Sequence, residues 1–593
     1  MRRPDVSAFI ALVLFTALLT DSPAAAVPVE LRLVTAAHYL QSVPFLVRVE
    51  ALNADGVPDR SLWNATVSLA SENPAVSLST NVVHLRNGLG SALVRLSGAG
   101  DFTLRAALDG LITTRTVADN SGAELELVGG ALTGAATTWS GIIRVTNDVT
   151  VPVGHTLRIL PGTMVLFDGV ASGTTANDLV VRGNVQSIGT AANPITFACA
   201  QADLRWGQLR HTNAQPSIYR HTIVTRGGRG RSEGHTGTVP VVRPYNSKVT
   251  FEQCSLTDFA EPSGTPGKVA QASGSDLTFV DCLFQRARMG PEIAGTALAC
   301  TNTWILDMIG PDDADGIYLH DQAAGQKVTL SGCVLAAGGD DGIDTLGSVI
   351  TVEKCIVRDW NSVTEDAKGI SAFNGAVHVR ESVIVDCTVG IAAKCGASTS
   401  VLVTLNDSTL HGNLTNVLAQ FKANAPGPVV DYRITNSILV GADRSVQSDF
   451  TETNFTIRYS NISEPWPGDG NLIADPMFVS LATHDFRLAP RSPSIDSGDP
   501  LSPLDPDGSR RDQGAFRFVA PAPMLGVPRF LPGGGAEFDL IAYPGRNYVI
   551  ESSDDVRSWA FLKTSFQSAE TNLVAAPSVP AEPHRFYRAR VAP

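Results

Sequence analysis

Three short acidic groups lie between residues 312 and 366 of this 593-residue chain. They are Asp312, Asp313 and Asp315; Asp340 and Asp341; and Glu365 and Asp366. Carboxylates crowded on one surface either hold a proton, because like charges raise each other's pKa, or recruit a cation. A carboxylic acid that stays neutral can protonate a glycosidic oxygen, and a calcium ion can neutralise a uronate. The groups therefore indicate acid–base or calcium chemistry, provided that the fold brings them together.

Four predicted strands begin with a glycine followed by an apolar residue. Three of them lie beside the acidic groups, and the fourth lies one coil beyond them. The four segments are 315–320, 341–346, 368–373 and 389–394. Strand alternation with the isoleucines inward gives one turn stack and two outward columns. These are Asp315, Asp341 and Lys368; Tyr318, Asp344, Ser371 and Ala392; and His320, Leu346, Phe373 and Lys394.

These positions predict the site. We expect catalytic roles for Asp315, Asp340, Asp341, Lys368 and Lys394. Substrate contacts are expected from Tyr318, His320, Asp344, Phe373 and Trp360. Cation ligands are expected from Asp312, Asp313, Glu365 and Asp366, with calcium as the ion that oxygen ligands suit and no cofactor required.

The stack also divides the roles. Asp315 has no neighbouring cation and is the candidate acid, whereas Asp341 lies beside Lys368, which is expected to keep it ionised as a base. A purely structural turn ladder, or a ladder that binds calcium without catalysis, stays open, because Asp-Gly before a strand is ordinary turn chemistry.

The elements that would carry this site form a repeat. The template apolar-x-apolar-x-x-small-x-apolar recurs every 21 to 30 residues. It fits 249–256, 277–284, 298–305, 328–335, 350–357, 377–384 and 403–410, and more loosely 432–439 and 455–462. Each match predicts one coil of a parallel β-helix, with insertions confined to turns. Template positions one, three, six and eight should face inward, with a bend between the third and the sixth.

Four of the eight cysteines occupy the sixth template position. They are Cys254, Cys282, Cys333 and Cys355, and we expect them buried and reduced, because in-register parallel neighbours have poor disulfide geometry. Replacing Cys333 by Ser is expected to destabilise the fold, since a hydroxyl in an apolar column needs a partner. Cys387 and Cys395 lie outside the column and are the best candidates for a disulfide.

The flanks of the repeat resemble a known fold family. Residues 149–163 and 193–197 are similar to the entry coils of right-handed parallel β-helix proteins of the pectate-lyase-like class. Residues 475–478, 492–498, 505–508 and 512–515 are similar to their exit. The resemblance covers about 130–516 and implies the fold, which hosts lyases, hydrolases, adhesins and spikes.

The acidic pattern resembles the active site of the polygalacturonase family. On that resemblance Asp315-Gly316 matches the family's Asp-Gly step, Asp340-Asp341 its Asp pair, and Lys394 its final Lys. The sequence departs from the family where Asp313 replaces Asn, Lys368 replaces His and Ala392 replaces an Arg that grips a carboxylate. The three Asp positions fit inverting hydrolysis, and the departures put galacturonan in doubt.

The ends of the chain add three predicted parts. Residues 1–26 have a basic start, an apolar run and a small-residue end, as in a signal peptide. Residues 27–125 alternate apolar and polar residues between turns and predict an immunoglobulin-like β-sandwich. The β-helix is expected over 126–516 and a small C-terminal β-domain over 517–593, so the fold class is all-β.

Composition limits the partners. With 45 basic and 58 acidic residues the chain has a net charge of −13, which argues against a nucleic-acid partner. No segment after the signal peptide predicts membrane insertion, and nothing indicates an oligomeric state.

We expect a secreted carbohydrate-active protein that cleaves an extracellular, acidic or decorated polysaccharide, with hydrolase ahead of lyase. The rival class is a non-catalytic surface or adhesion protein in which the β-helix is a stalk.

Overall fold

The structure is a computed structural model of the chain. It describes residues 28–41, 43–173, 175–261, 265–310, 313–362, 367–395, 399–421, 430–449, 454–532, 535–576 and 585–592. The predicted signal peptide lies outside the described residues.

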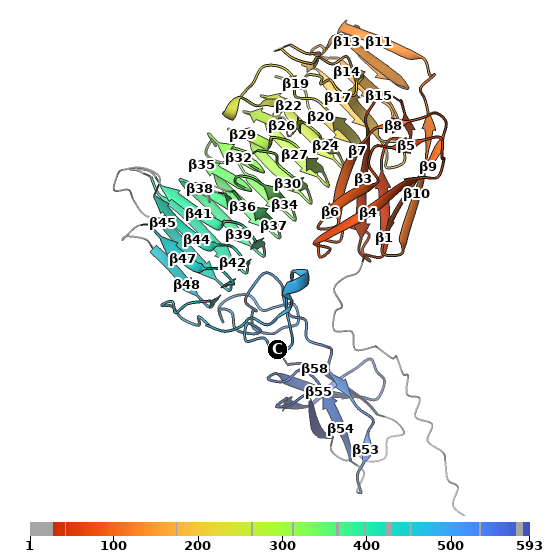
Figure 1. Ribbon diagram of the computed structural model, residues 1–593. Coiled ribbons are helices and arrows are strands. Elements are labelled where there is room, and N and C mark those ends of the chain that lie inside the picture. Colours follow the sequence, from red (N-terminus) through yellow and green to blue (C-terminus); the bar gives the residue numbers. More distant parts are fainter. Residues whose placement is uncertain are drawn as a thin grey trace, which may run out of the picture.

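Most of the described chain is a parallel β-helix (Figure 1). Its coils run from β11 (Leu125–Ala131) to β49 (Asn461–Ile462), and strands of successive coils pair in parallel register. A 13-stranded sheet forms a first face, and the other two faces are joined in a 26-stranded sheet. The predicted parallel β-helix and the all-β class are therefore confirmed.

The coils around the acidic groups each supply one strand to every face. The first-face strands are β30 (Ala297–Thr301), β33 (Val328–Ser331), β36 (Val349–Glu353) and β39 (Gly375–Arg380). The second-face strands are β31 (Trp304–Leu306), β34 (Val334–Gly338), β37 (Ile356–Trp360) and β40 (Val383–Val385). The third-face strands are β29 (Met289–Ala294), β32 (Ile317–His320), β35 (Ile343–Leu346), β38 (Lys368–Phe373), β41 (Val389–Cys395), β44 (Thr415–Phe421) and β47 (Arg444–Ser448).

The bend in the repeat template is produced by a single residue in the left-handed backbone conformation. The fifth template position has a positive φ, between 44° and 66°, in nine successive coils. These residues are Gln253, Asp281, Asn302, Gly332, Lys354, Glu381, Asp407, Asn436 and Tyr459. A single residue in this conformation turns the strand and shifts the inward phase, so positions three and six both reach the core.

The sixth position forms an internal column whose polar atoms have partners. All eight cysteines are buried thiols that form no disulfide, which confirms the four column thiols and makes the Cys387–Cys395 disulfide wrong. Ser382 lies one coil beyond Cys355; its Oγ donates to the Arg380 carbonyl at 2.8 Å and accepts from the Cys355 amide at 3.1 Å. A hydroxyl in this column is therefore satisfied by a carbonyl of its own turn and an amide of the preceding coil.

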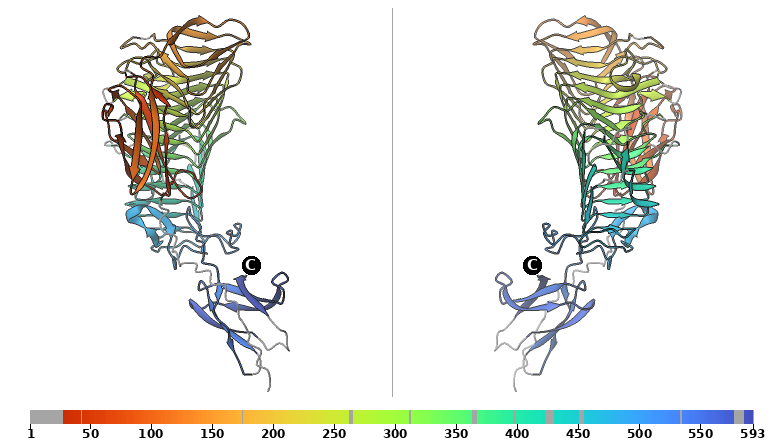
Figure 2. Two further views of the ribbon diagram at one scale, coloured as in Figure 1. Left: turned by 90° about the vertical axis from the view of Figure 1, so that its right-hand side faces the viewer. Right: turned by 90° about the vertical axis from the view of Figure 1, so that its left-hand side faces the viewer.

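The N-terminal strands form a separate β-domain beside the coils (Figure 2). They are β1 (Glu30–Val34), β2 (His38–Tyr39), β3 (Phe45–Leu52), β4 (Asn64–Ser71), β6 (Val82–Arg86), β7 (Leu89–Val94), β9 (Phe102–Leu108) and β10 (Leu111–Asp119), joined mostly antiparallel in one eight-stranded sheet around its own core. Its immunoglobulin-like classification stays a prediction.

This domain packs on the second face of the β-helix. The Trp304 indole donates to the carbonyls of Arg86 and Asn87, at 3.1 Å each. The fully buried Arg358 donates to the Trp63 carbonyl at 2.6 Å. The second face is therefore covered, and the acidic groups lie at its border with the third.

The C-terminal part has two small antiparallel sheets. They contain β52 (Met524–Leu525), β53 (Arg529–Phe530), β54 (Ala536–Ile541) and β57 (Thr571–Ala576), and β55 (Asn547–Ser553), β56 (Ala560–Phe566) and β58 (Phe586–Val591). Arg546 ties this part to the segment after the last coil through Asp496 and Asp507. Two short 3-10 helices occur in the described chain, η1 (His235–Gly237) and η2 (Leu481–Thr483), and no described helix is long and apolar enough to cross a membrane.

The column geometry reverses the expectation for Cys333. A Ser there can donate to the Ser331 carbonyl and accept an amide from the preceding coil, as Ser382 does. We now expect Cys333→Ser to change the free energy of unfolding by less than about 1 kcal/mol. Cys333→Leu, the matched overpacking control, should cost about 1–3 kcal/mol. Thermal unfolding of both variants measures the difference, and equal losses would contradict the hydroxyl ladder.

Candidate active site

The acidic groups lie where the second face turns into the third. The Gly316 amide donates to the Asp341 carbonyl at 2.9 Å, and the Gly342 amide to the Lys368 carbonyl at 2.8 Å. These bonds stack Asp315, Asp341 and Lys368 in three neighbouring coils, as the sequence predicted. The two outward columns also have the predicted register, from Tyr318 to Ala392 and from His320 to Lys394.

The glycines of this stack are required by close packing. A Cβ on Gly316 would lie 2.4 Å from the Gly342 carbonyl oxygen, and one on Gly342 would lie 2.6 Å from that of Gly369. Both positions also touch the Trp360 indole, at 3.1 Å and 2.9 Å. Trp360 is fully buried and donates to the Leu335 carbonyl at 3.2 Å, so its predicted role as a substrate contact is wrong.

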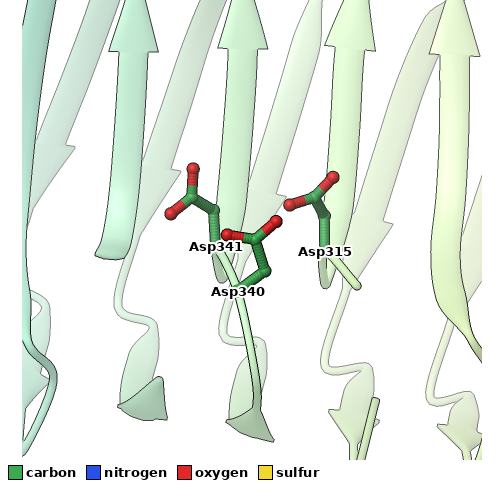
Figure 3. A group of neighbouring side chains, drawn as sticks. All are labelled: Asp315, Asp340 and Asp341. Carbon is green, nitrogen blue, oxygen red and sulfur yellow. The ribbon is translucent and has the colours of Figure 1, made fainter. Parts of the chain in front are cut away.

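Three carboxyl groups meet above this core. Figure 3 shows the side chains of Asp315, Asp340 and Asp341 converging from neighbouring coils. One carboxylate oxygen of each lies within 4.8 Å of the others, so the group could hold a metal ion. Asp315 is 3% exposed and Asp341 5%, whereas Asp340 is partly exposed. Of the predicted cation ligands, Asp312, Glu365 and Asp366 lie outside the described residues.

Asp313 lies at the edge of this cluster and is not one of its three members. Its amide donates to Asp340 Oδ2 at 2.6 Å, and its carboxylate pairs with His235 Nε2 at 3.0 Å. The carboxylate of Asp313 thus faces a histidine, while its backbone helps to fix the Asp340 side chain.

Burial and mutual repulsion raise the pKa of both buried carboxyls. For Asp315 burial is the main cause, followed by Asp344, Asp341 and Asp340, and its pKa lies well above the usual value. For Asp341 burial also dominates, but Lys368, with Nζ 3.5 Å from Oδ1, and Lys394 oppose it, and the pKa is raised to about 7. Asp315 is therefore the more easily protonated member, as predicted, although Lys368 does not keep Asp341 fully ionised at neutral pH.

The outward columns place a polar surface beside the cluster. Asp344 accepts a hydrogen bond from Ser371 Oγ at 2.8 Å, and Phe373 is partly exposed. Lys394 is buried and near enough to Asp341 to lower its pKa. Tyr318 is nearly buried, and burial with nearby carboxylates raises its pKa to about 12.

His320 is held as a cation and is not available as a base. Its Nε2 bonds to Glu292 Oε1 at 3.2 Å and its Nδ1 to Asp321 Oδ2 at 2.8 Å. Ionised carboxylates only accept hydrogen bonds, so both ring nitrogens must donate. The bond to Glu292 accordingly raises the pKa of His320.

Sequence reasoning missed a buried ion pair next to this site. Lys268 and Glu292 are both fully buried and paired. Burial raises the pKa of Glu292, but His320 and Lys268 outweigh it and lower the pKa to about 2. Glu292 lies two residues after Gly290, which stacks on Gly316 in the next coil. Following the column of glycines one coil toward the N-terminus would therefore have identified Glu292 from the sequence.

The same carboxylate fixes a loop over the third face. The His235 amide donates to both oxygens of Glu292 at 3.0 Å. A Cβ on Gly234, whose φ is +77°, would lie 2.3 Å from Glu292 Oε1, so only glycine fits there. The anchored loop brings the His235 ring within 5.0 Å of Tyr318, whose other neighbour is the His320 ring, also at 5.0 Å.

Comparisons with known proteins give fold likeness only. No family model and no curated protein matches the chain. A solved pectate lyase, Pel9A, is 14% identical over 60% of this chain and 88% of its own, with a TM-score of 0.28. An alginate lyase from Paenibacillus sp. str. FPU-7 is 11% identical, covering 53% and 99%, with a TM-score of 0.24. The mannuronan C-5 epimerase AlgE6 A-module of Azotobacter vinelandii is 10% identical, covering 60% and 92%, with a TM-score of 0.23.

The raised pKa of Asp315 predicts a pH-dependent stability. Below about pH 4 the carboxyl is protonated in both states; at higher pH the folded state alone retains the proton, so stability falls as pH rises. The Asp315→Asn variant has no titrating carboxyl at this position, so it does not lose stability in this way as the pH rises. In chelator, the variant should unfold at a higher temperature than wild type at pH 8, with the advantage shrinking toward pH 4. Asp276→Asn, exposed on β27 (Asp276–Val280) of the first face, is the control. An identical pH dependence of wild type and Asp315→Asn would contradict the burial of an ionisable Asp315.

Proposed function

We propose that this chain is a secreted glycoside hydrolase that cleaves an extracellular polysaccharide, with Asp315 as the proton donor. The observation that carries the proposal is the stack of Asp315, Asp341 and Lys368, in which neighbouring carboxyls have different environments. A carboxyl that stays neutral at working pH is what protonation of a glycosidic oxygen needs. The predicted signal peptide supports secretion.

The second carboxyl would act on the sugar. Asp341 is the member next to a cation, so it is the one that ionises first and can serve as base or nucleophile. One oxygen of Asp315 lies within 4.8 Å of one oxygen of Asp341. This is nearer the about 5–5.5 Å between carboxyls in retaining glycosidases than the about 6.5–9.5 Å in inverting ones. The spacing thus favours retention over the inverting arrangement suggested by the sequence.

The other predicted residues would bind and orient the substrate. Four of the predicted catalytic and substrate-contact residues are partly exposed and are the first that a sugar would meet, namely His320, Asp340, Asp344 and Phe373. Lys394 would assist Lys368 in holding negative charge on Asp341. His320, bonded on both ring nitrogens, would present a fixed positive edge and take no proton.

A second candidate is a non-catalytic β-helix whose acidic turns hold a calcium ion. The observation that favours it is the low exposure of Asp315 and Asp341, together with the close approach of three carboxylates. Oxygen ligands suit calcium, and a structural ion would hold adjacent coils together. In this case the same residues would stabilise the protein without turning over a substrate.

Turnover decides between the two. Asp341→Asn is nearly isosteric and should keep the fold while lowering kcat by about 10²–10⁴-fold. The secreted protein is screened against a polysaccharide panel, measuring new reducing ends for hydrolysis and ultraviolet absorbance of unsaturated uronates for elimination. Asp276→Asn should keep full activity. A fully active Asp341→Asn variant would contradict the catalytic role of Asp341. Unsaturated products would show that the enzyme is a lyase and not a hydrolase.

Calcium binding gives an independent prediction. Added calcium at about 100 times its Kd should stabilise the fold by about 2.7 kcal/mol, because only the folded state collects the three carboxylates. Thermal unfolding is followed with calcium and with chelator, for wild type and for Asp340→Asn. Wild type should gain and the variant should gain less. An unchanged wild-type midpoint would contradict the second candidate, which depends on the ion.

A further inference from the structure

A polar hollow opens on the C-terminal side of the carboxyl cluster, at the same corner of the β-helix. Its volume is about 440 Å³. Its lining includes Asn361, Asp386, Thr388, Asn413, Leu414 and Asp443. These residues come from four successive coils, and none of them belongs to the catalytic set described above.

Backbone register places the hollow in line with the cluster. The Val389 amide donates to the Ala367 carbonyl at 3.1 Å, the Thr415 amide to Thr388 at 3.2 Å, and the Arg444 amide to Leu414 at 3.3 Å. Because Asp341 stacks on Lys368, the residues just before them stack as well. The column therefore reads Asp340, Ala367, Thr388, Leu414 and Asp443, one residue per coil.

This column has the spacing of a linear polymer site. Successive coils are about 4.8 Å apart, which is close to the length of one sugar ring. A polysaccharide lying across the coils with one ring near Asp340 would place its following rings over Thr388, Leu414 and Asp443. Leu414 is 45% exposed and offers an apolar surface on which the face of a ring can rest.

The charges of the hollow select the kind of sugar. Asn361, Thr388 and Asn413 offer amide and hydroxyl groups, and Asp386 and Asp443 offer carboxylates. Lysine and arginine are absent from the described lining residues. The His484 imidazole lies beside one of these carboxylates, with Nε2 3.2 Å from Asp386 Oδ2. Carboxylates accept hydrogen bonds from sugar hydroxyls but repel the carboxylate of a uronate.

We propose that this hollow binds the sugar units on one side of the cleavage point and that these units are uncharged. The inference rests on the proposed function and deepens it by naming the substrate class, a neutral polysaccharide, where the sequence had suggested an acidic or decorated one. The substrate would extend from Asp340 toward the C-terminal coils.

Binding tests the inference without requiring turnover. The full-length protein is run through native gels containing galactomannan, xyloglucan or arabinoxylan, and through gels containing polygalacturonate or alginate. At least one neutral polymer should retard wild type more than either acidic polymer. Leu414→Trp removes the aliphatic surface and occupies part of the hollow, so it should weaken that retardation at least tenfold in apparent Kd. Val349→Trp places the same side chain at an exposed position of β36 on the first face and should bind as wild type.

A charge reversal sharpens the test. Asp443→Lys should increase retardation by polygalacturonate, because it replaces a carboxylate by an ammonium group that attracts the uronate carboxylates. Stronger retention of wild type by an acidic polymer, no retention by any polymer, or wild-type binding by Leu414→Trp would each overturn the inference.

Activity separates this inference from the proposed function. If wild type cleaves a polysaccharide and Leu414→Trp leaves KM unchanged, the hollow is not a substrate site. The proposed hydrolase function would then stand without this inference. If wild type binds a neutral polymer through Leu414 and cleaves none of the panel, the hollow is a glycan site and the hydrolase proposal fails. For an active wild type, Leu414→Trp should raise KM at least tenfold with kcat retained.

Discussion

A column of glycines holds the site together, because successive coils touch there backbone to backbone. A Cβ on any of its members would lie 1.7–2.7 Å from the carbonyl oxygen of the next coil. The members are Gly290, Gly316, Gly342, Gly369 and Gly390. Such contact leaves no freedom to shift the register, so the residue before each glycine is fixed above the one in the preceding coil. Turns of different length can follow elsewhere in each coil without moving Asp315, Asp341 or Lys368.

This rigid stack allows two carboxylates on one face to have opposite character. Glu292 is surrounded by Lys268, His320 and the His235 amide, so it stays ionised, with a pKa of about 2. Asp315 is as deeply buried but faces other carboxylates, so it retains its proton. Burial alone would raise the pKa of both; partners placed by the fold decide which becomes an anion and which an acid.

The sequence was sufficient for the parts of this arrangement that follow from periodicity. The register of Asp315, Asp341 and Lys368 was predictable because a Gly step recurs in each coil. Trp360 was misassigned because a second left-handed turn, at Asp359 with φ +58°, reverses the alternation just before it and sends the indole inward over Gly338. A left-handed aspartate in a turn has no distinct signal in one sequence. The Lys268–Glu292 pair was missed because the Gly step was not followed one coil further back, to Gly290. The contact of His235 with Glu292 had no signal in the sequence, because His235 lies in a long loop whose path depends on tertiary contacts.

The two sides of the carboxyl cluster together bear on the type of reaction. On the N-terminal side, Glu292 and its partners are fully hydrogen-bonded, so their side chains are held in place and neither donate nor accept a proton in the reaction. On the C-terminal side, the hollow around Leu414 offers hydrogen-bonding groups and carboxylates but no lysine or arginine among its described lining residues. Elimination needs a sugar carboxylate, which makes the neighbouring carbon–hydrogen bond acidic, and a cation to neutralise that carboxylate. A neutral sugar offers no such proton, and its glycosidic bond is broken by protonating the leaving oxygen. If the substrate is neutral, the neutral carboxyl of Asp315 and the more readily ionised Asp341 are therefore the groups that hydrolysis requires, and the same charges disfavour a lyase.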